Sequence, residues 1–171
     1  MNRLSALVVA SLFLAACAST TKPAETKPAE PVKQAAEPVK TDTASQAQVE
    51  AEKMAAALQA LQSESIYFDF DKSGIKTEYR NTLQHHADWL KAHDKDTVTL
   101  EGNADERGSS EYNMALGNRR ADSVHRALVA MGIDGSRIKD VSFGEEKPRA
   151  SCHEEKCWSQ NRRVDFVYKS E

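Results

Sequence analysis

Residues 110–131 read SEYNMALGNRRADSVHRALVAM, and this stretch decides the fold. Small and apolar side chains recur along it at alternating steps of three and four residues, a spacing that places them on one side of an α-helix. Gly132 is a typical stop for such a helix. The stretch therefore predicts a long helix with one buried stripe, which consists of Met114, Gly117, Ala121, Val124, Leu128 and Met131.

Segments in which apolar and polar residues alternate, as they do in β-strands, precede and follow this helix in the sequence. Residues 66–70 (IYFDF) form one of them, and its inward face would carry Ile66, Phe68 and Phe70. The turn-forming residues DKSG follow at 71–74. The order βαβαββ predicts an α/β fold, an α+β sandwich in which two main helices pack on one mixed sheet of about four strands. The remaining predicted elements are a helix over residues 76–93 and strands over residues 97–101, 138–143 and 163–168.

Composition divides the chain of 171 residues into a folded part and a tether. All seven glycines and ten of the eleven aromatic residues lie at or after Tyr67, whereas four of the five prolines lie between positions 23 and 38. We therefore expect a folded domain over residues 66–171 and a disordered spacer over residues 17–65, in which the segments KPAE and AEPVK each occur twice. Within that spacer a weak apolar stripe favours a lead-in helix over residues 44–62, formed by Val49, Met54, Leu58 and Leu61.

The first sixteen residues have the pattern of a secretory signal. A positively charged N-terminal region is followed by an apolar run over residues 4–14 and then by small residues of the kind found at cleavage sites. The apolar run is too short to span a membrane. The string Leu-Ala-Ala-Cys at residues 14–17 resembles a bacterial lipobox, which implies cleavage before Cys17 and acylation of its thiol and its new amino group. The alternative is cleavage elsewhere, with Cys17 left as an ordinary thiol.

Charge and motif content bear on the class of function. With 23 Lys and Arg against 26 Asp and Glu, the chain has no basic excess that would favour nucleic acid as a partner. His85, His86 and His93 could suggest a metal site or acid–base catalysis, but no nucleophile or metal motif accompanies them. We therefore expect no catalytic residue and no metal site. Cys152 and Cys157 favour a disulfide in an exported protein; a zinc site with His153 and a redox pair are the alternatives.

One loop and one helix face could together form a small polar pocket. Asn113 and Arg120 are seven residues apart and so share a helix face, which we expect at the rim of the buried stripe. Asp105 precedes this helix in a glycine-containing loop. A carboxylate and a guanidinium placed together suit a zwitterion, because Arg120 can bind a carboxylate while Asp105 binds an ammonium. A solvated Asp–Arg salt bridge is the alternative, and the neighbouring charged residues are expected on a solvated face: Glu106, Arg107, Arg119 and Arg163.

Four ordered motifs give the domain a resemblance to a known family. They are YFDFDK at residues 67–72, EGNADERG at 101–108, EYN through LGNRRA at 111–121, and NRR at 161–163. Together they resemble the OmpA-like C-terminal domain family, and with the lipobox and tether the chain is similar to its outer-membrane lipoproteins. Asn103 is a departure, since the family often has histidine there, and it cannot titrate.

The resemblance implies a binding protein, neither an enzyme nor dependent on a cofactor. The domain would face the periplasm on a lipid anchor in the outer membrane and bind peptidoglycan non-covalently through the meso-diaminopimelate of its stem peptide. It would link the membrane to the cell wall, with the Tol proteins TolA and TolB as further partners. Asp105 and Arg120 match the family's clamp pair, and Asn113, Arg162 and Asp71 match its pocket wall.

Overall fold

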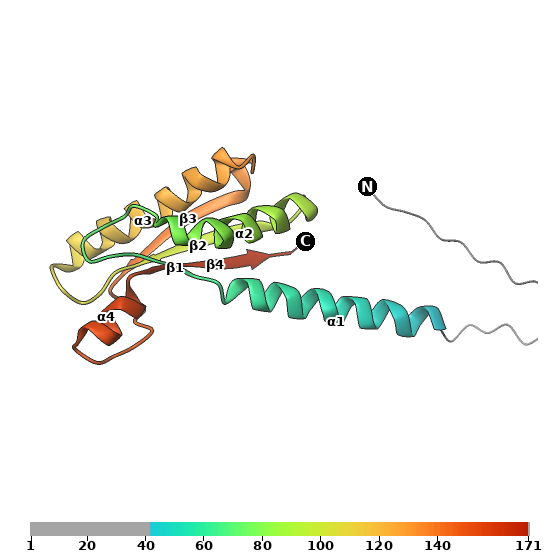
Figure 1. Cartoon of the computed structure of the whole chain (residues 1–171), viewed down its shortest axis with the longest axis horizontal. Coiled ribbons are helices and arrows are strands. Elements are labelled where there is room, and N and C mark those ends of the chain that lie inside the picture. The colour runs from blue at the N-terminus through green and yellow to red at the C-terminus, as the bar shows by residue number, and fades with distance from the viewer. Residues whose placement is uncertain (1–41, 171) are drawn as a thin grey trace, which may run out of the picture. The chain divides into compact units, whose positions relative to one another are not determined.

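The structure, a computed structural model, describes residues 42–170, which all belong to one compact unit over residues 40–171 (Figure 1). The signal, Cys17 and the repeats predicted as a tether lie outside the described residues. Within residues 42–170, no helix is both long and apolar enough to cross a bilayer. The elements in chain order are α1 (Asp42–Gln62), β1 (Ile66–Tyr67), α2 (Arg80–Ala92), β2 (Thr97–Asn103), α3 (Ser110–Ala130), β3 (Ile138–Gly144), α4 (Glu155–Asn161) and β4 (Arg163–Lys169).

The strands form one mixed sheet in the order β1-β4-β2-β3. Strand β2 runs parallel to β3 and antiparallel to β4, and β1 pairs antiparallel with β4. In this register Val98 lies opposite Tyr168 and Leu100 lies opposite Phe166, and all four are buried. Helices α2 and α3 bury their apolar sides against these residues in one core. The predicted fold class, two main helices on a four-stranded mixed sheet, is confirmed.

A glycine contact sets α3 very close to β2. A Cβ atom added at Gly102 would lie 2.0 Å from the carbonyl oxygen of Gly117. One added at Gly117 would lie 2.3 Å from the hydroxyl of Ser142 on β3. Only glycine permits this approach, which brings the first half of α3 beside the loop that follows β2. That junction is where the predicted pocket residues meet.

The structure corrects the predicted burial at four positions. Strand β1 ends at Tyr67, and the chain then turns away, so Phe70 is 54% exposed and does not face inward. Met114 is exposed, whereas Asn113 and Arg120 are buried at 1% and 0% exposure. Most of the predicted stripe is buried, but in the first half of α3 the buried face also includes Asn113 and Arg120, so Arg120 is not at its rim.

Two helices extend the predicted architecture. The lead-in helix is present as α1, and its end packs on the core: Leu61 is buried and Leu58 contacts the core, while Val49 and Met54 are exposed. Helix α4 was not predicted. It lies between β3 and β4 and begins inside the segment between the two cysteines.

Candidate ligand-binding site

A pocket of about 220 Å³ lies between the loop after β1, the loop after β2 and the first half of α3. The cap of α3 fixes this junction, because the side chain of Ser109 accepts a hydrogen bond from the backbone N–H of Tyr112. The wall carries two carboxylates and two guanidinium groups, with further lining from Phe70, Tyr112 and Asn113. The four charged residues are Asp71, Asp105, Arg107 and Arg120.

Arg120 is a buried cation held by backbone oxygens. Its guanidinium donates to the carbonyls of Lys72 at 2.9 Å, Asn103 at 2.7 Å and Asp69 at 3.2 Å. Burial lowers the pKa of Arg120 to about 10, and the nearby charge of Asp105 partly offsets this effect, so the side chain remains charged at neutral pH. Within residues 42–170 it forms no ion pair. Three of its five N–H groups are used, and two remain for another acceptor.

Asp105 is buried and forms ion pairs with two arginines. Its Oδ1 accepts from the backbone N–H and Nε of Arg107, both at 3.1 Å, and its Oδ2 accepts from Arg107 at 2.7 Å and Arg162 at 3.2 Å. Burial alone would raise the pKa of Asp105, but these hydrogen bonds outweigh it and hold the pKa below its usual value. The carboxylate is therefore ionised and fixed in orientation.

Arg107 was predicted on a solvated face, and the structure shows this to be wrong. Its guanidinium carbon lies 4.0 Å from the ring centre of Phe70 and 4.1 Å from that of Trp158, in cation–π contact with both. Hydrogen bonding to Asp105 raises the pKa of Arg107 further. Arg107 thus joins the pocket to α4, on which Trp158 lies.

Arg162 lies behind the pocket rather than in its wall. It follows α4 directly, is 5% exposed, and donates to the carbonyl of Phe68 at 3.0 Å as well as to Asp105. Its outer nitrogen donates to Glu155 at 2.5 Å, and this bond holds the pKa of the Glu155 carboxyl below its usual range. Arg162 therefore orients Asp105 from the side away from the cavity.

Asp71 and Asn113 line the pocket. Asp71 has a positive φ of 56°, which turns the loop after β1 back toward α3, and it accepts a hydrogen bond from the hydroxyl of Tyr112. That bond raises the pKa of Tyr112. Asn113 donates to Glu145, which follows β3. Asp71 has no ion-pair partner among residues 42–170.

Asn103, at the position where the family often has histidine, contributes to the pocket indirectly, through a hydrogen bond with Arg120. It is 1% exposed, and its backbone carbonyl is one of the three acceptors of Arg120. Its side-chain nitrogen donates to the carbonyl of Glu101 at 2.9 Å, while its Oδ1 has no partner among the described residues. It does not line the cavity.

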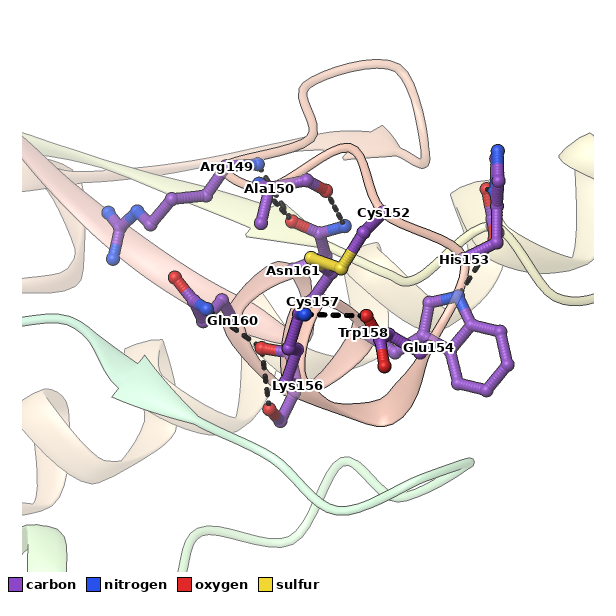
Figure 2. The surroundings of a disulfide bond; sticks show 12 residues. Arg149, Ala150, Cys152, His153, Glu154, Lys156, Cys157, Trp158, Gln160 and Asn161 are labelled. Atoms are coloured by element: carbon purple, nitrogen blue, oxygen red, sulfur yellow. Dashed lines mark hydrogen bonds and ion pairs between the residues drawn. A yellow bond between two sulfur atoms is a disulfide. The ribbon is translucent and has the colours of Figure 1, made fainter.

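The predicted disulfide between Cys152 and Cys157 is present, with 5.5 Å between the Cα atoms (Figure 2). Glu106 is exposed, as predicted, and it accepts hydrogen bonds from His153 at 2.7 Å and from the indole of Trp158 at 2.8 Å. Arg163 was also predicted on a solvated face, and this is wrong: it is buried and pairs with Asp165 at 2.8 Å.

Comparisons with known proteins agree with this architecture. The sequence model of the OmpA family matches residues 67–162. The peptidoglycan-associated lipoprotein of Agrobacterium fabrum is 47% identical over 102 residues, which are 60% of this chain and 58% of that protein. The protein of that name from Pasteurella multocida is 47% identical over 104 residues, 61% of this chain and 69% of the relative. The chain thus spans less than two thirds of the length of the first of these relatives.

Solved structures give the same result for the fold. The crystal structure of the peptidoglycan-associated lipoprotein from Burkholderia pseudomallei is 48% identical and superposes with a TM-score of 0.61 over 63% of this chain and 91% of that chain. The C-terminal domain of MotB from Helicobacter pylori is 16% identical with a TM-score of 0.59, over 63% of this chain and 85% of that chain, a likeness of fold alone.

Proposed function

The chain belongs to the OmpA family, and we propose that it is a lipid-anchored envelope protein that binds peptidoglycan non-covalently and so links the outer membrane to the cell wall. Its relatives are named as peptidoglycan-associated lipoproteins, which agrees with the prediction that the chain is not an enzyme. The anchor would be the acylated Cys17, and the binding domain would lie in the periplasm. The observation that carries the proposal is the pocket beside Arg120.

Arg120 provides the site for a ligand carboxylate. A buried guanidinium that no carboxylate neutralises attracts an anion strongly, because the protein around it screens charge less than water does. The carbonyls of Lys72, Asn103 and Asp69 fix the group in place while leaving two N–H groups for a ligand. A carboxylate bound there would gain charge-assisted hydrogen bonds without any need to order the arginine first.

Asp105 and Asp71 provide the site for an ammonium group. Both carboxylates line the same cavity as Arg120, and Asp71 has no cationic partner among the described residues. An ammonium between them would share Asp105 with Arg107 and bring Asp71 its first ion pair. A ligand that carries a carboxylate and an ammonium on one carbon therefore satisfies both sides of the pocket.

The ligand that fits this arrangement in a bacterial envelope is the meso-diaminopimelate of the peptidoglycan stem peptide. The free end of its side chain carries one carboxylate and one ammonium, whereas a lysine at the same position has only the ammonium. We propose that Asp105 and Arg120 hold this end, with Asn113 and Asp71 as further wall and Arg162 as the group that orients Asp105. The Tol proteins TolA and TolB, and a role in envelope integrity and outer-membrane constriction at division, are part of the same proposal through the family resemblance.

Titration with paired stem peptides tests the ligand assignment. The full-length protein in detergent should bind a diaminopimelate-containing stem peptide more tightly than its lysine-containing analogue, by about ten- to a hundredfold, because the lysine peptide lacks the carboxylate that Arg120 would bind. The protein should also sediment with insoluble cell wall and release no stem peptide. Equal affinity for the two peptides would contradict the role of Arg120.

A further inference from the structure

Helix α4 is too short to be stable on its own and lacks a side-chain cap. It has seven residues, Glu155–Asn161, and its N-cap residue Glu154 makes no capping hydrogen bond with its side chain. Isolated helices of this length are marginal in water. The bond between Cys152 and Cys157 ties the segment before the helix to its first turn (Figure 2). We infer from this that the disulfide, and not intrinsic helix propensity, holds the start of α4.

The opposite end of α4 is held independently of the disulfide. The side-chain oxygen of Asn161 accepts from the backbone N–H groups of Arg149 at 2.8 Å and Ala150 at 2.9 Å, and its nitrogen donates to the carbonyl of Ala150 at 2.8 Å (Figure 2). Neither cysteine belongs to the main apolar core. Loss of the disulfide should therefore loosen the first turns of α4 and leave the fold intact.

The side chains presented by those first turns reach the ligand pocket. The ring of Trp158 stacks on the guanidinium of Arg107, and its indole N–H donates to Glu106, beside Asp105. Glu155 accepts two hydrogen bonds from Arg162. Arg107 and Arg162 together provide all four hydrogen bonds to the Asp105 carboxylate.

We propose that the Cys152–Cys157 disulfide positions the ligand pocket: it holds α4 so that Trp158 and Glu155 fix the two arginines that orient Asp105. The proposal rests on the proposed function of this pocket. Without the disulfide, Trp158 and Glu155 must be ordered when the ligand binds rather than beforehand. Ordering two side chains at that stage weakens binding by about five- to fiftyfold.

The test compares wild-type protein with a Cys152→Ser/Cys157→Ser variant, both as full-length protein in detergent. Calorimetric titration with the diaminopimelate stem peptide should show the five- to fiftyfold loss, while far-UV circular dichroism remains that of the wild type. Wild type reduced with dithiothreitol, which is itself oxidised to its cyclic disulfide, should behave like the variant. The same reductant added to the variant should have no effect and serves as the control.

A thermodynamic cycle separates positioning from a general structural role. If the disulfide acts through Trp158, then removing it from a Trp158→Ala protein should weaken binding much less than removing it from wild type. Independent effects would simply add. Should the serine variant fail to fold, Trp158→Ala with its disulfide intact tests the same contact, and wild-type affinity in that protein would overturn the proposal.

Fluorescence tests the positioning without any ligand. The chain has two tryptophans, so Trp89→Phe leaves Trp158 as the only one. Acrylamide should quench the fluorescence of Trp158 more strongly after the disulfide is reduced than before. Unchanged quenching, or unchanged affinity in a folded variant, would overturn the inference while leaving the proposed function standing. A wild-type protein that binds no stem peptide would refute the proposed function itself, and this positioning role with it.

Discussion

Replacing Arg120 by methionine should destabilise the domain strongly, because this side chain fastens three parts of the backbone together. The loop after β1 contributes the carbonyls of Asp69 and Lys72, and the end of β2 contributes that of Asn103. Methionine fills much of the same space but donates no hydrogen bond. The substitution therefore isolates the loss of these bonds from the loss of side-chain volume.

The expected loss of stability follows from the fate of the three carbonyls. A hydrogen bond to a charged group contributes about 1.5 to 3 kcal/mol, and a buried acceptor left without a partner loses a similar amount. The carbonyls of Asp69 and Lys72 belong to exposed turn residues and can regain water, whereas Asn103 is 1% exposed. Removing the buried charge also returns part of its desolvation energy. The net loss in the free energy of unfolding should be about 3 to 5 kcal/mol.

Urea unfolding followed by far-UV circular dichroism measures this loss. For a slope of about 2 kcal/mol per molar urea, the midpoint of Arg120→Met should lie roughly 2 M below that of wild type. Arg119→Met is the matched control: Arg119 is the preceding residue of α3, is exposed, and has its guanidinium carbon 5.6 Å from the ring centre of Tyr112. Its midpoint should move by less than about 0.5 M. An Arg120→Met midpoint equally close to wild type would refute the reasoning.

Three further predictions address pH, the anchor and the ligand. Burial lowers the pKa of His86 to about 4 from an ordinary 6.5, so between these pH values the unfolded chain binds the proton and the native protein does not. The free energy of unfolding should therefore fall by up to about 3 kcal/mol as the pH drops from 6.5 to 4. Urea titrations of the His86→Gln variant should not show this contribution. Cys17→Ala should leave the protein soluble or uncleaved, and a processed protein that stays in the membrane fraction would contradict this. Asp105→Asn should weaken binding of the diaminopimelate peptide by about ten- to a hundredfold in calorimetry, because it removes the charge that attracts the ammonium; Asp122→Asn, on the outer part of α3, should bind like wild type.

The sheet and the main helices are predictable from sequence because their side-chain periodicity corresponds to their burial. Val98 and Leu100 alternate along β2 and both point into the core. Helix α3 begins after the Ser109 cap and ends before Gly132, whose φ of 93° is unfavourable for any other residue. Local capping and long-range packing favour the same boundaries in α3, which is why its expected limits differ from the observed ones by about one residue.

Arg120 shows where periodicity alone fails. The apolar stripe of α3 suggests that Met114 is inside and Arg120 at the rim, yet the two are exposed and buried respectively. Three carbonyls converge on one point of the helix surface, and their combined hydrogen bonds offset the desolvation of a charge that hydropathy would place in water. That convergence depends on the turn at Asp71 and the close approach at Gly117, which no pattern within α3 reveals.

Helix α4 contacts the arginines that orient Asp105, and its sequence shows no periodic pattern of its own. Seven residues are too few to show a helical period, and Trp158 meets Arg107, which also stacks on Phe70, only after the chain has folded. The pair of cysteines was the available clue, since an exposed short loop closed by a disulfide suggests a segment whose conformation needs fixing. Sequence thus indicated that residues 152–157 were constrained, and the structure shows which contacts that constraint serves.

The balance of charges around the pocket explains why a zwitterion suits it better than an ion of either sign. Its wall carries two cations and two anions, of which Arg107 and Asp105 already pair with each other. The other two, Arg120 and Asp71, have no ion-pair partner among residues 42–170. A ligand with only a carboxylate would bind Arg120 but place its charge in the same cavity as Asp71 and Asp105. A ligand with only an ammonium would leave Arg120 without a counterion. An amino-acid end avoids both conflicts, and because it carries no net charge, its binding should depend only weakly on salt, unlike the adsorption of a polyanion to a basic surface.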